Sequence, residues 1–261
     1  MRTVYLIAVL YLLHLTTPFA QTPQTIERNL MKAFMRIDYW GQHRFDNQGK
    51  PEDSLFEANK RFSKTLYRYS TKCPLTIYFK FNKLEKKINI IRASDSLFTI
   101  YSWDSQTGGT MHFFNNVFQY KRSKRTYAIV DTPWADGDIG DLFRKIYTFK
   151  NRGKSYYLCT YMFIESTRYY GEGIRIFSVR KDTLDSNIRL IKTKSGLTSD
   201  VSYEYDLGLY DFRGNWKAKP EIYFDRHSKT INLPLITSNG RMTHRYIKYK
   251  FTGQYFERFK N

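Results

Sequence analysis

The residues best suited to proton transfer are Asp104 and His112, which flank the turn around Gly108. Alternating residues on both sides of the turn predict a β-hairpin, which could bring the carboxylate and the imidazole to one face. A histidine beside a carboxylate can transfer protons near neutral pH, as a hydrolase would require. The alternative is a hydrogen-bonded packing histidine, because no Gly-x-Ser-x-Gly or His-Glu-x-x-His motif accompanies the pair. Asp104 and His112 are therefore the candidate catalytic residues if the protein is an enzyme.

The acidic segment DTPWADGDIGD supplies the candidate metal ligands Asp136, Asp138 and Asp141. Alternating carboxylates of this kind begin a calcium-binding loop, and Ca²⁺ is the only cofactor that the sequence suggests. The match is incomplete, because Gly140 occupies a ligand position and Tyr147 stands where the loop needs its last glutamate. The alternative is an aspartate-rich turn that caps the segment after it.

Basic and aromatic residues alternate in the segment RMTHRYIKYKF near the end of the chain. On a strand, Tyr246, Lys248 and Lys250 would share one face, because side chains alternate with a period of two. Such a face could stack on sugar rings and attract an anionic glycan or another envelope component. It is equally typical of a solvated strand whose charges discourage aggregation.

The first residues indicate export. Arg2 precedes the apolar run Val4–Leu15, and the small residues that follow predict a signal peptide over residues 1–20 with cleavage after Ala20. We therefore expect a periplasmic or extracellular protein without a later transmembrane segment. The formal net charge is +19. Export makes nucleic acid an unsuitable partner, so this charge either attracts an anionic envelope component or simply solubilises the surface.

The chain has 2 cysteines, Cys73 and Cys159. An exported protein permits a disulfide between them, which would stabilise the fold by closing a long loop. The alternative is two free thiols, since Cys159 lies in the apolar run SYYLCTYMFI, where a small buried side chain also fits.

Residues 21–74 are predicted to form two helices that pack on a sheet. The first helix would begin at Thr22-Pro23, and a capping box of Ser54 and Glu57 would begin the second. Apolar residues recur every three or four positions on one face of each helix. They are Ile26, Leu30, Phe34 and Ile37, then Leu55, Ala58, Phe62, Leu66 and Tyr69.

Residues 75–261 are predicted to form an antiparallel β-rich domain. The apolar period changes to two, and aromatic residues, which suit half-buried strands, make up 18% of the chain. Short strands with tight turns favour a mainly β fold, an antiparallel meander of propeller-like or sandwich form, with helices only at the N-terminus. The predicted strands include Thr76–Phe81, Leu97–Trp103, Thr110–Lys121, Ser155–Ile164 and Met242–Phe251.

The hairpin carries a Trp-Asp pair, but the pair does not repeat at the period of a WD-repeat propeller. Its pattern is YSWD…GGT-x-x-FF, formed by Tyr101–Asp104, Gly108–Thr110 and Phe113-Phe114. This pattern, after two helices and before aromatic strands, resembles that of uncharacterised exported bacterial proteins, and the resemblance implies no activity. We expect a non-enzymatic envelope or extracellular module for binding or structure, with the Asp104/His112 hydrolase as the alternative.

Overall fold

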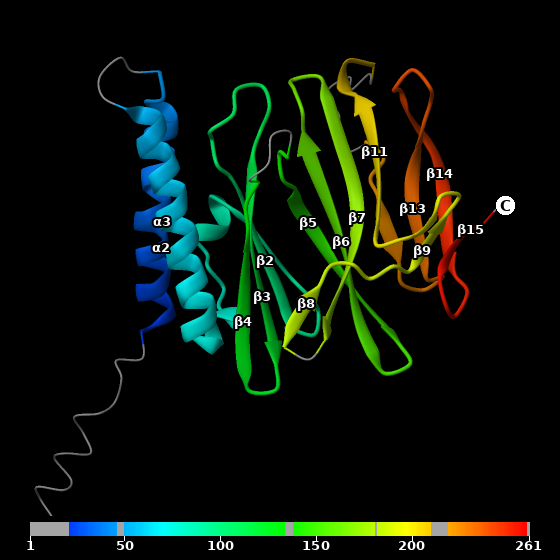
Figure 1. The fold of residues 1–261 in the computed structure, drawn as a ribbon, viewed down its shortest axis with the longest axis horizontal. Coiled ribbons are helices and arrows are strands. Elements are labelled where there is room, and N and C mark those ends of the chain that lie inside the picture. The colour runs from blue at the N-terminus through cyan, green and yellow to red at the C-terminus, as the bar shows by residue number, and fades with distance from the viewer. Residues whose placement is uncertain (1–20, 46–49, 134–137, 181, 210–218, 260–261) are drawn as a thin grey trace, which may run out of the picture.

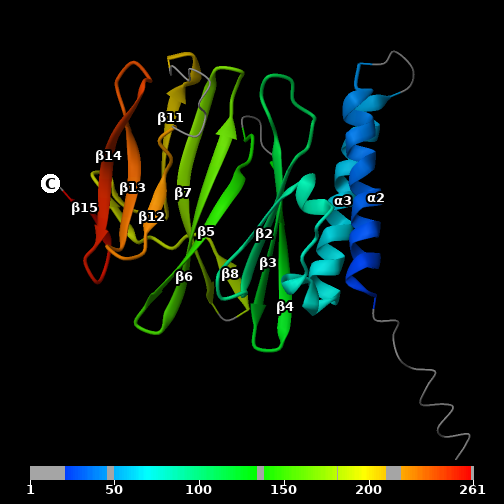
Figure 2. The same cartoon turned by 180° about the vertical axis from the view of Figure 1, so that it is seen from behind.

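Three β-sheets and a pair of helices are stacked as four layers, which Figures 1 and 2 show from opposite sides. The architecture confirms the expected mainly β fold with two N-terminal helices and antiparallel sheets, although strands β9 and β15 of the third sheet pair in parallel. No helix in the described part of the chain is long and apolar enough to cross a membrane. The predicted signal peptide lies outside the described residues. This computed structural model describes residues 21–45, 50–133, 138–180, 182–209 and 219–259.

The helical layer consists of α2 (Pro23–Gln42) and α3 (Pro51–Lys72). The Thr22 hydroxyl accepts the N–H of Thr25 at 3.2 Å and caps α2 where the sequence predicts. The predicted capping box of α3 is wrong, because this helix begins at Pro51, which favours the first helical position. The apolar faces are buried as expected in both helices.

The first sheet has the strand order β1-β2-β3-β4. Its strands are β1 (Asn89–Arg92), β2 (Phe98–Asp104), β3 (Phe114–Arg122) and β4 (Arg125–Asp131). The helices cover one face of this sheet and the second sheet covers the other. As a result, nearly every side chain of β2 and β3 is buried, whichever face it lies on.

The β2–β3 hairpin differs from its prediction in the length of its loop. Strand β3 begins at Phe114 rather than at Thr110. Strand β2 ends where Asp104 Oδ1 accepts the N–H of Gln106 at 2.8 Å, and Gln106 adopts a φ of 60°. In the loop, a Cβ at Gly108 would lie 1.9 Å from the Met111 carbonyl oxygen, so glycine is required there.

A second difference lies after α3, where the sequence predicts a strand over Thr76–Phe81. The structure has a short 3-10 helix, η1 (Pro74–Tyr78), in this place. Pro74 begins the turn, and the Thr76 hydroxyl donates to the Cys73 carbonyl at 2.7 Å. These local hydrogen bonds hold the backbone in a helical turn and prevent strand pairing.

The second and third sheets lie beyond the first. The second has the order β11-β7-β6-β5, with β8 paired to β7, and the third has the order β10-β9-β15-β14-β13-β12. The strands of the second sheet are β5 (Leu142–Asn151), β6 (Lys154–Ile164), β7 (Tyr169–Arg180), β8 (Thr183–Asp185) and β11 (Asp200–Asp206). Those of the third are β9 (Ile191–Thr193), β10 (Gly196–Thr198), β12 (Tyr223–Asp225), β13 (Thr230–Ile236), β14 (Met242–Phe251) and β15 (Phe256–Phe259).

Each interface between layers has its own apolar core. Between the helices and the first sheet, the Phe62 ring contacts Phe34 and Trp103 edge-on, with centroid distances of 5.3 and 4.9 Å. Between the first and second sheets, Phe118 packs against Phe143 at 5.4 Å. Fully burying a side chain of this size contributes roughly 1.5–3 kcal/mol. The buried aromatic residues therefore supply much of the free energy that holds the layers together.

The cysteines lie in different cores and are both free. Cys73 packs against the core under the helices, whereas Cys159 lies in the core between the first and second sheets. The disulfide considered from the sequence is therefore not formed. Burial raises the pKa of the Cys159 thiol well above its usual value, which keeps it protonated and unreactive.

Candidate functional site

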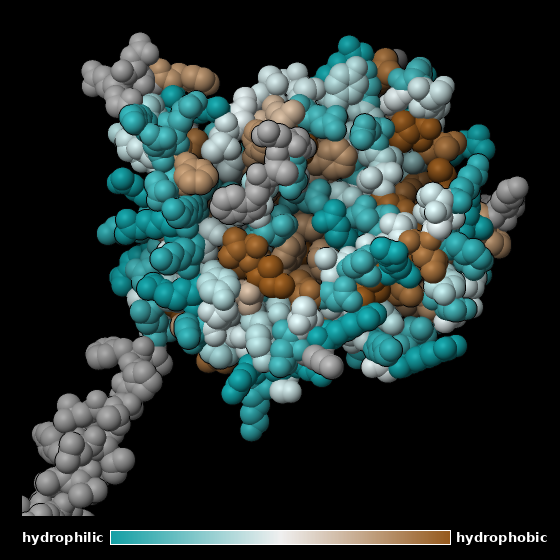
Figure 3. Space-filling view, in the orientation of Figure 1, coloured by the Kyte–Doolittle hydropathy of each residue, from teal (hydrophilic) through white to brown (hydrophobic). Residues whose placement is uncertain are grey.

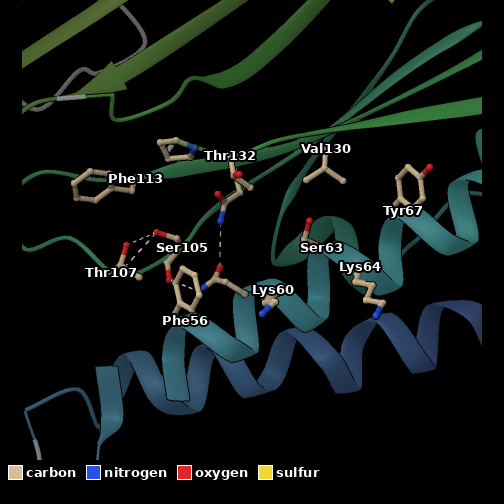
Figure 4. A pocket seen from close by; sticks show the side chains of 13 residues that line it. Phe56, Lys60, Ser63, Lys64, Tyr67, Ser105, Thr107, Phe113, Val130 and Thr132 are labelled. Atoms are coloured by element: carbon tan, nitrogen blue, oxygen red, sulfur yellow. Dashed lines mark hydrogen bonds between the residues drawn. The ribbon is translucent and has the colours of Figure 1, made fainter. Parts of the chain in front are cut away.

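A pocket of about 600 Å³ opens between α3 and the edge strand β4 of the first sheet. We call it the α3–β4 pocket, and Figure 4 shows its lining from α3, from β4 and from the loop after β2. Its walls combine apolar and small polar side chains with two lysines. They are Phe56, Asn59, Lys60, Ser63, Lys64, Tyr67, Ser105, Thr107, Phe113, Asn115, Val130, Thr132 and Pro133.

Helix α3 supplies one wall through residues three or four positions apart. Phe56, Lys60, Ser63, Lys64 and Tyr67 follow this spacing, which places them on one side of the helix. The opposite wall includes Val130, which shares a face of β4 with Ala128, a residue packed against the core under the helices. The pocket is thus a place where α3 and the sheet edge are not in full contact.

The buried amide of Asn59 fixes the floor of the pocket. Its Nδ2 donates to the carbonyls of Leu55 at 3.0 Å and Ser105 at 2.9 Å. Its Oδ1 accepts from Trp103 Nε1 at 3.0 Å and from Asn115 Nδ2 at 3.4 Å. Because both ends of the amide are used, Asn59 joins α3 rigidly to β2 and β3 beneath any ligand.

The remaining lining can contact a ligand. Phe56 is 52% exposed, Tyr67 is 42% exposed and Val130 is 39% exposed, although all three are large and apolar. The Thr132 hydroxyl is buried and makes no hydrogen bond within the described part of the chain. Lys60 and Lys64 are exposed on α3 beside this apolar surface. An apolar hollow with a few polar groups is the usual form of a small-molecule site.

The structure brings Asp104 and His112 together, as the hairpin suggested. His112 Nδ1 lies 2.5 Å from Asp104 Oδ2, and the His112 ring stacks on Phe114 at 6.2 Å. Within the described residues, this ring has no other hydrogen-bond partner, so no hydroxyl or thiol is hydrogen-bonded to it. Neither residue lines the α3–β4 pocket, although Ser105 and Phe113 beside them do. In this geometry the pair closes the loop between β2 and β3.

Asp138 and Asp141 line a different hollow, of about 400 Å³, together with Glu165 and Glu204. Asp138 Oδ1 accepts the N–H of Gly140 at 2.9 Å, as expected for an aspartate-rich turn. Over the described ranges, no group of three or more His, Cys, Asp or Glu side chains could hold a metal ion. Asp136, the third calcium candidate, lies outside the described residues.

Asp141 belongs to a partly buried ion-pair cluster that sequence reasoning missed. Arg175 of β7 binds Asp141 Oδ2 at 2.9 Å and Asp200 Oδ2 at 2.8 Å, and the Tyr161 hydroxyl donates to Asp200 at 2.6 Å. Burial raises the pKa of Asp141 to about 6, against the opposing effect of Arg175. Burial, and then the charge of Asp200, raise the pKa of Tyr161. The cluster ties β5, β6, β7 and β11 together.

A second missed cluster surrounds Glu172 of β7, which is 3% exposed. Glu172 forms an ion pair with Lys219, and its other carboxylate oxygen accepts from the Tyr203 hydroxyl at 2.6 Å. Burial, and then the charge of Glu172, raise the pKa values of Tyr203 and Tyr205. A lone glutamate between Gly171 and Gly173 was the only sequence signal, and it does not reveal the distant lysine.

The third candidate set, Tyr246, Lys248 and Lys250, lies on one face of β14 as predicted. This face points away from the core, because Tyr249 and Phe251 on the other face pack inward. Tyr246 packs against Tyr223 at 5.6 Å. Lys250 Nζ lies 5.6 Å from the centre of the Phe259 ring, and Lys250 pairs across the strands with Glu257.

In comparisons with known proteins, no family model, no curated protein and no solved structure matches the chain. The interpretation of the α3–β4 pocket therefore depends on its geometry and chemistry.

Proposed function

We propose that the protein is an exported binding module whose α3–β4 pocket holds an envelope molecule with an apolar body and an anionic group. The observation that carries this proposal is the combination of an apolar hollow with Lys60 and Lys64 in its lining. Export itself is inferred from the sequence of residues 1–20, and the binding role does not require an enzymatic step.

The apolar part of the proposed ligand follows from the walls. A volume of about 600 Å³ falls within the roughly 300–1,000 Å³ of ordinary ligand pockets. Phe56, Tyr67 and Val130 leave apolar area in contact with water, and covering such area contributes about 25 cal/mol per Å². An acyl chain or a comparable hydrocarbon would cover it.

The anionic part follows from the polar groups. Lys60 and Lys64 are one helical turn apart on the same side of α3, so both ammonium groups can approach one carboxylate or phosphate. Lys60 has a salt bridge of 3.4 Å to Glu57, which is exposed and therefore weak. The Thr132 hydroxyl, which has no hydrogen-bond partner among the described residues, adds a neutral donor inside the pocket.

The charge of the ligand can be tested with a series of probes that share one chain. Titration calorimetry would compare dodecanoate, dodecanol and dodecyltrimethylammonium. We expect dodecanoate to bind most tightly and Lys60→Gln/Lys64→Gln to lose that preference by roughly fivefold to tenfold. The matched control is Lys248→Gln/Lys250→Gln, which removes the same charge from the outer face of β14. Equal affinity for all three probes, or equal losses in both variants, would contradict the proposal.

An anionic glycan bound across Tyr246, Lys248 and Lys250 is a competing proposal within the same class of function. Fewer features support it, because Lys250 already lies over the Phe259 ring and opposite Glu257. Chromatography on an anionic polysaccharide column tests this alternative. The glycan is favoured if Lys60→Gln/Lys64→Gln is still retained and Lys248→Gln/Lys250→Gln is not.

The rival class is a hydrolase that uses the contact between His112 and Asp104. It receives less support, because no hydroxyl or thiol of the described residues is hydrogen-bonded to the His112 ring and the pair is outside the α3–β4 pocket. An assay with p-nitrophenyl esters separates the two classes. Turnover by the purified protein that His112→Ala abolishes would favour the hydrolase, whereas the binding proposal predicts none.

A further inference from the structure

A second hollow, of about 390 Å³, runs along the seam between α2 and α3. We call it the helix groove. Its lining comes from one side of each helix and contains four cations without any carboxylate. The lining residues are Asn29, Lys32, Ala33, Arg36, Arg61, Thr65, Arg68 and Tyr69.

The cations of the helix groove are unpaired because the carboxylates of both helices are used elsewhere. Glu27 accepts the backbone N–H groups of Lys83 at 2.7 Å and Leu84 at 3.1 Å, while Asp38 binds Lys87 at 2.5 Å. The α3 carboxylates lie near its start, where Glu52, Asp53 and Glu57 face Arg44, Lys50 and Lys60. Within the described chain, the four groove cations therefore have no ion-pair partner.

Basic residues of helix α3 line both the helix groove and the α3–β4 pocket. Arg61 and Arg68 line the groove, whereas Lys60 and Lys64 line the pocket, so four cations are exposed on α3 between Lys60 and Arg68. The exposed rings of Phe56 and Tyr67 border this basic surface. Figure 3 shows mainly hydrophilic side chains on the helical layer and apolar surface over the adjoining first sheet.

Charge and side-chain type together indicate what this face contacts. One arginine guanidinium group can donate two parallel hydrogen bonds to two oxygens of a phosphate. Exposed cations are also attracted to anionic lipid headgroups. Aromatic rings beside cations suit the boundary between headgroups and acyl chains. A soluble polyanion would satisfy the cations alone, whereas a bilayer would accommodate both the cations and the aromatic rings.

We propose that the outer face of α2 and α3 docks the protein on an anionic phospholipid bilayer. Lys32, Arg36, Arg61 and Arg68 provide the contacts with lipid phosphate groups, and Phe56 and Tyr67 lie at the edge of the contact. The docking face does not depend on ligand binding in the α3–β4 pocket. It does explain why that pocket lies on the same helix, since a bilayer is a source of amphipathic molecules.

The test is cosedimentation of the mature chain with vesicles of phosphatidylcholine alone and of phosphatidylcholine mixed equally with phosphatidylglycerol. We expect binding only to the anionic vesicles, weakening as salt is added. Arg61→Glu/Arg68→Glu should lose affinity by at least about tenfold. Lys248→Glu/Lys250→Glu makes the same change in total charge on the far side of the third sheet and should keep most of the binding.

Several outcomes would overturn the docking face. Equal losses in the two variants would show that net charge alone attracts the vesicles. Undiminished binding by Arg61→Glu/Arg68→Glu would exclude the helix groove. Capture by dextran sulfate, without binding to anionic vesicles, would assign the groove to a soluble polyanion. If the reversed variant does not fold, the milder Lys32→Gln/Arg36→Gln is compared with Lys248→Gln/Lys250→Gln, which removes the same charge. Titration with dodecanoate tests the pocket separately.

Discussion

The helical layer and the second sheet manage their charges in opposite ways. In the second sheet, Glu172 is buried and Arg175 is partly buried, and both are paired with partners from other strands or segments. On the helices, Arg61 and Arg68 are exposed and have no carboxylate partner in the described structure. Charge that is neutralised inside the fold holds strands together, whereas charge left unpaired on the surface is available to a ligand or a membrane.

Apolar side chains also differ between the two regions: they are buried in the second sheet and partly exposed beside α3. The faces of the second sheet are covered by its neighbours, and Phe143 and Tyr161 are fully packed. Beside α3, Phe56, Tyr67 and Val130 remain exposed around a hollow. This contrast is the reason we propose recognition on the helical side of the molecule and structural support in the sheets.

The largest expected effect is on stability, from Lys219→Met. This change leaves the buried Glu172 carboxylate without its cation, which should cost about 3–5 kcal/mol of unfolding free energy. The double variant Lys219→Met/Glu172→Leu should recover much of the loss, because it also removes the stranded charge. Urea unfolding measures both. A loss below about 1 kcal/mol, or a double variant no more stable than the single one, would show that the cluster is not the structural support inferred here.

The next effect tests the floor of the pocket, where Asn59→Ala removes the partner of Trp103 Nε1 and the Ser105 carbonyl. Leaving these buried groups unpaired should cost about 2–3 kcal/mol. Asn29→Ala is the matched control, because that amide makes a single partly exposed hydrogen bond to the Tyr69 hydroxyl. Chemical denaturation of both variants makes the comparison, and similar losses would show that the floor has no special role.

The pH dependence of stability should reveal Asp141. Burial raises the pKa of its carboxyl to about 6 in the folded protein, above the ordinary value of 3.8. Its contribution is therefore fully present below the ordinary pKa and is lost as the pH rises through about 6, by on the order of 3 kcal/mol. The variant Asp141→Asn should lack this decline. The difference in unfolding free energy between the unmodified protein and the variant should therefore change with pH. Parallel profiles for the two proteins would contradict the assignment.

The smallest effect is expected on the helices. Arg61→Glu/Arg68→Glu should change the unfolding free energy by less than about 1 kcal/mol. Both side chains are exposed and form no ion pair with the described residues, although Arg68 lies over the Tyr69 ring. Thermal melting checks this. A loss as large as that of Lys219→Met would erase the contrast between the helical layer and the second sheet.

Local patterns in the sequence predicted much of the scaffold. The apolar stripes of both helices, the contact between Asp104 and His112, and the shared face of Tyr246, Lys248 and Lys250 all follow from spacing along one or two neighbouring elements. The start of β3 was misjudged because the turn made by Asp104 and Gln106 depends on a side-chain hydrogen bond.

The functional features needed tertiary information. The α3–β4 pocket exists because Phe56 and Val130, far apart in the chain, line the same incompletely filled interface. The pairing of Glu172 with Lys219 likewise joins distant segments. In the helix groove, the cations were visible in the sequence, but only the structure shows that Glu27 and Asp38 turn to other partners.

The most direct test of the account is the affinity for dodecanoate of Val130→Phe compared with Ile129→Phe. The two residues are neighbours on β4 and are 39% and 38% exposed, but only Val130 lines the α3–β4 pocket. We expect Val130→Phe to fill the pocket and weaken binding by more than about tenfold, while Ile129→Phe binds as the unmodified protein does. Equal affinities in the two variants would show that the ligand does not occupy this pocket.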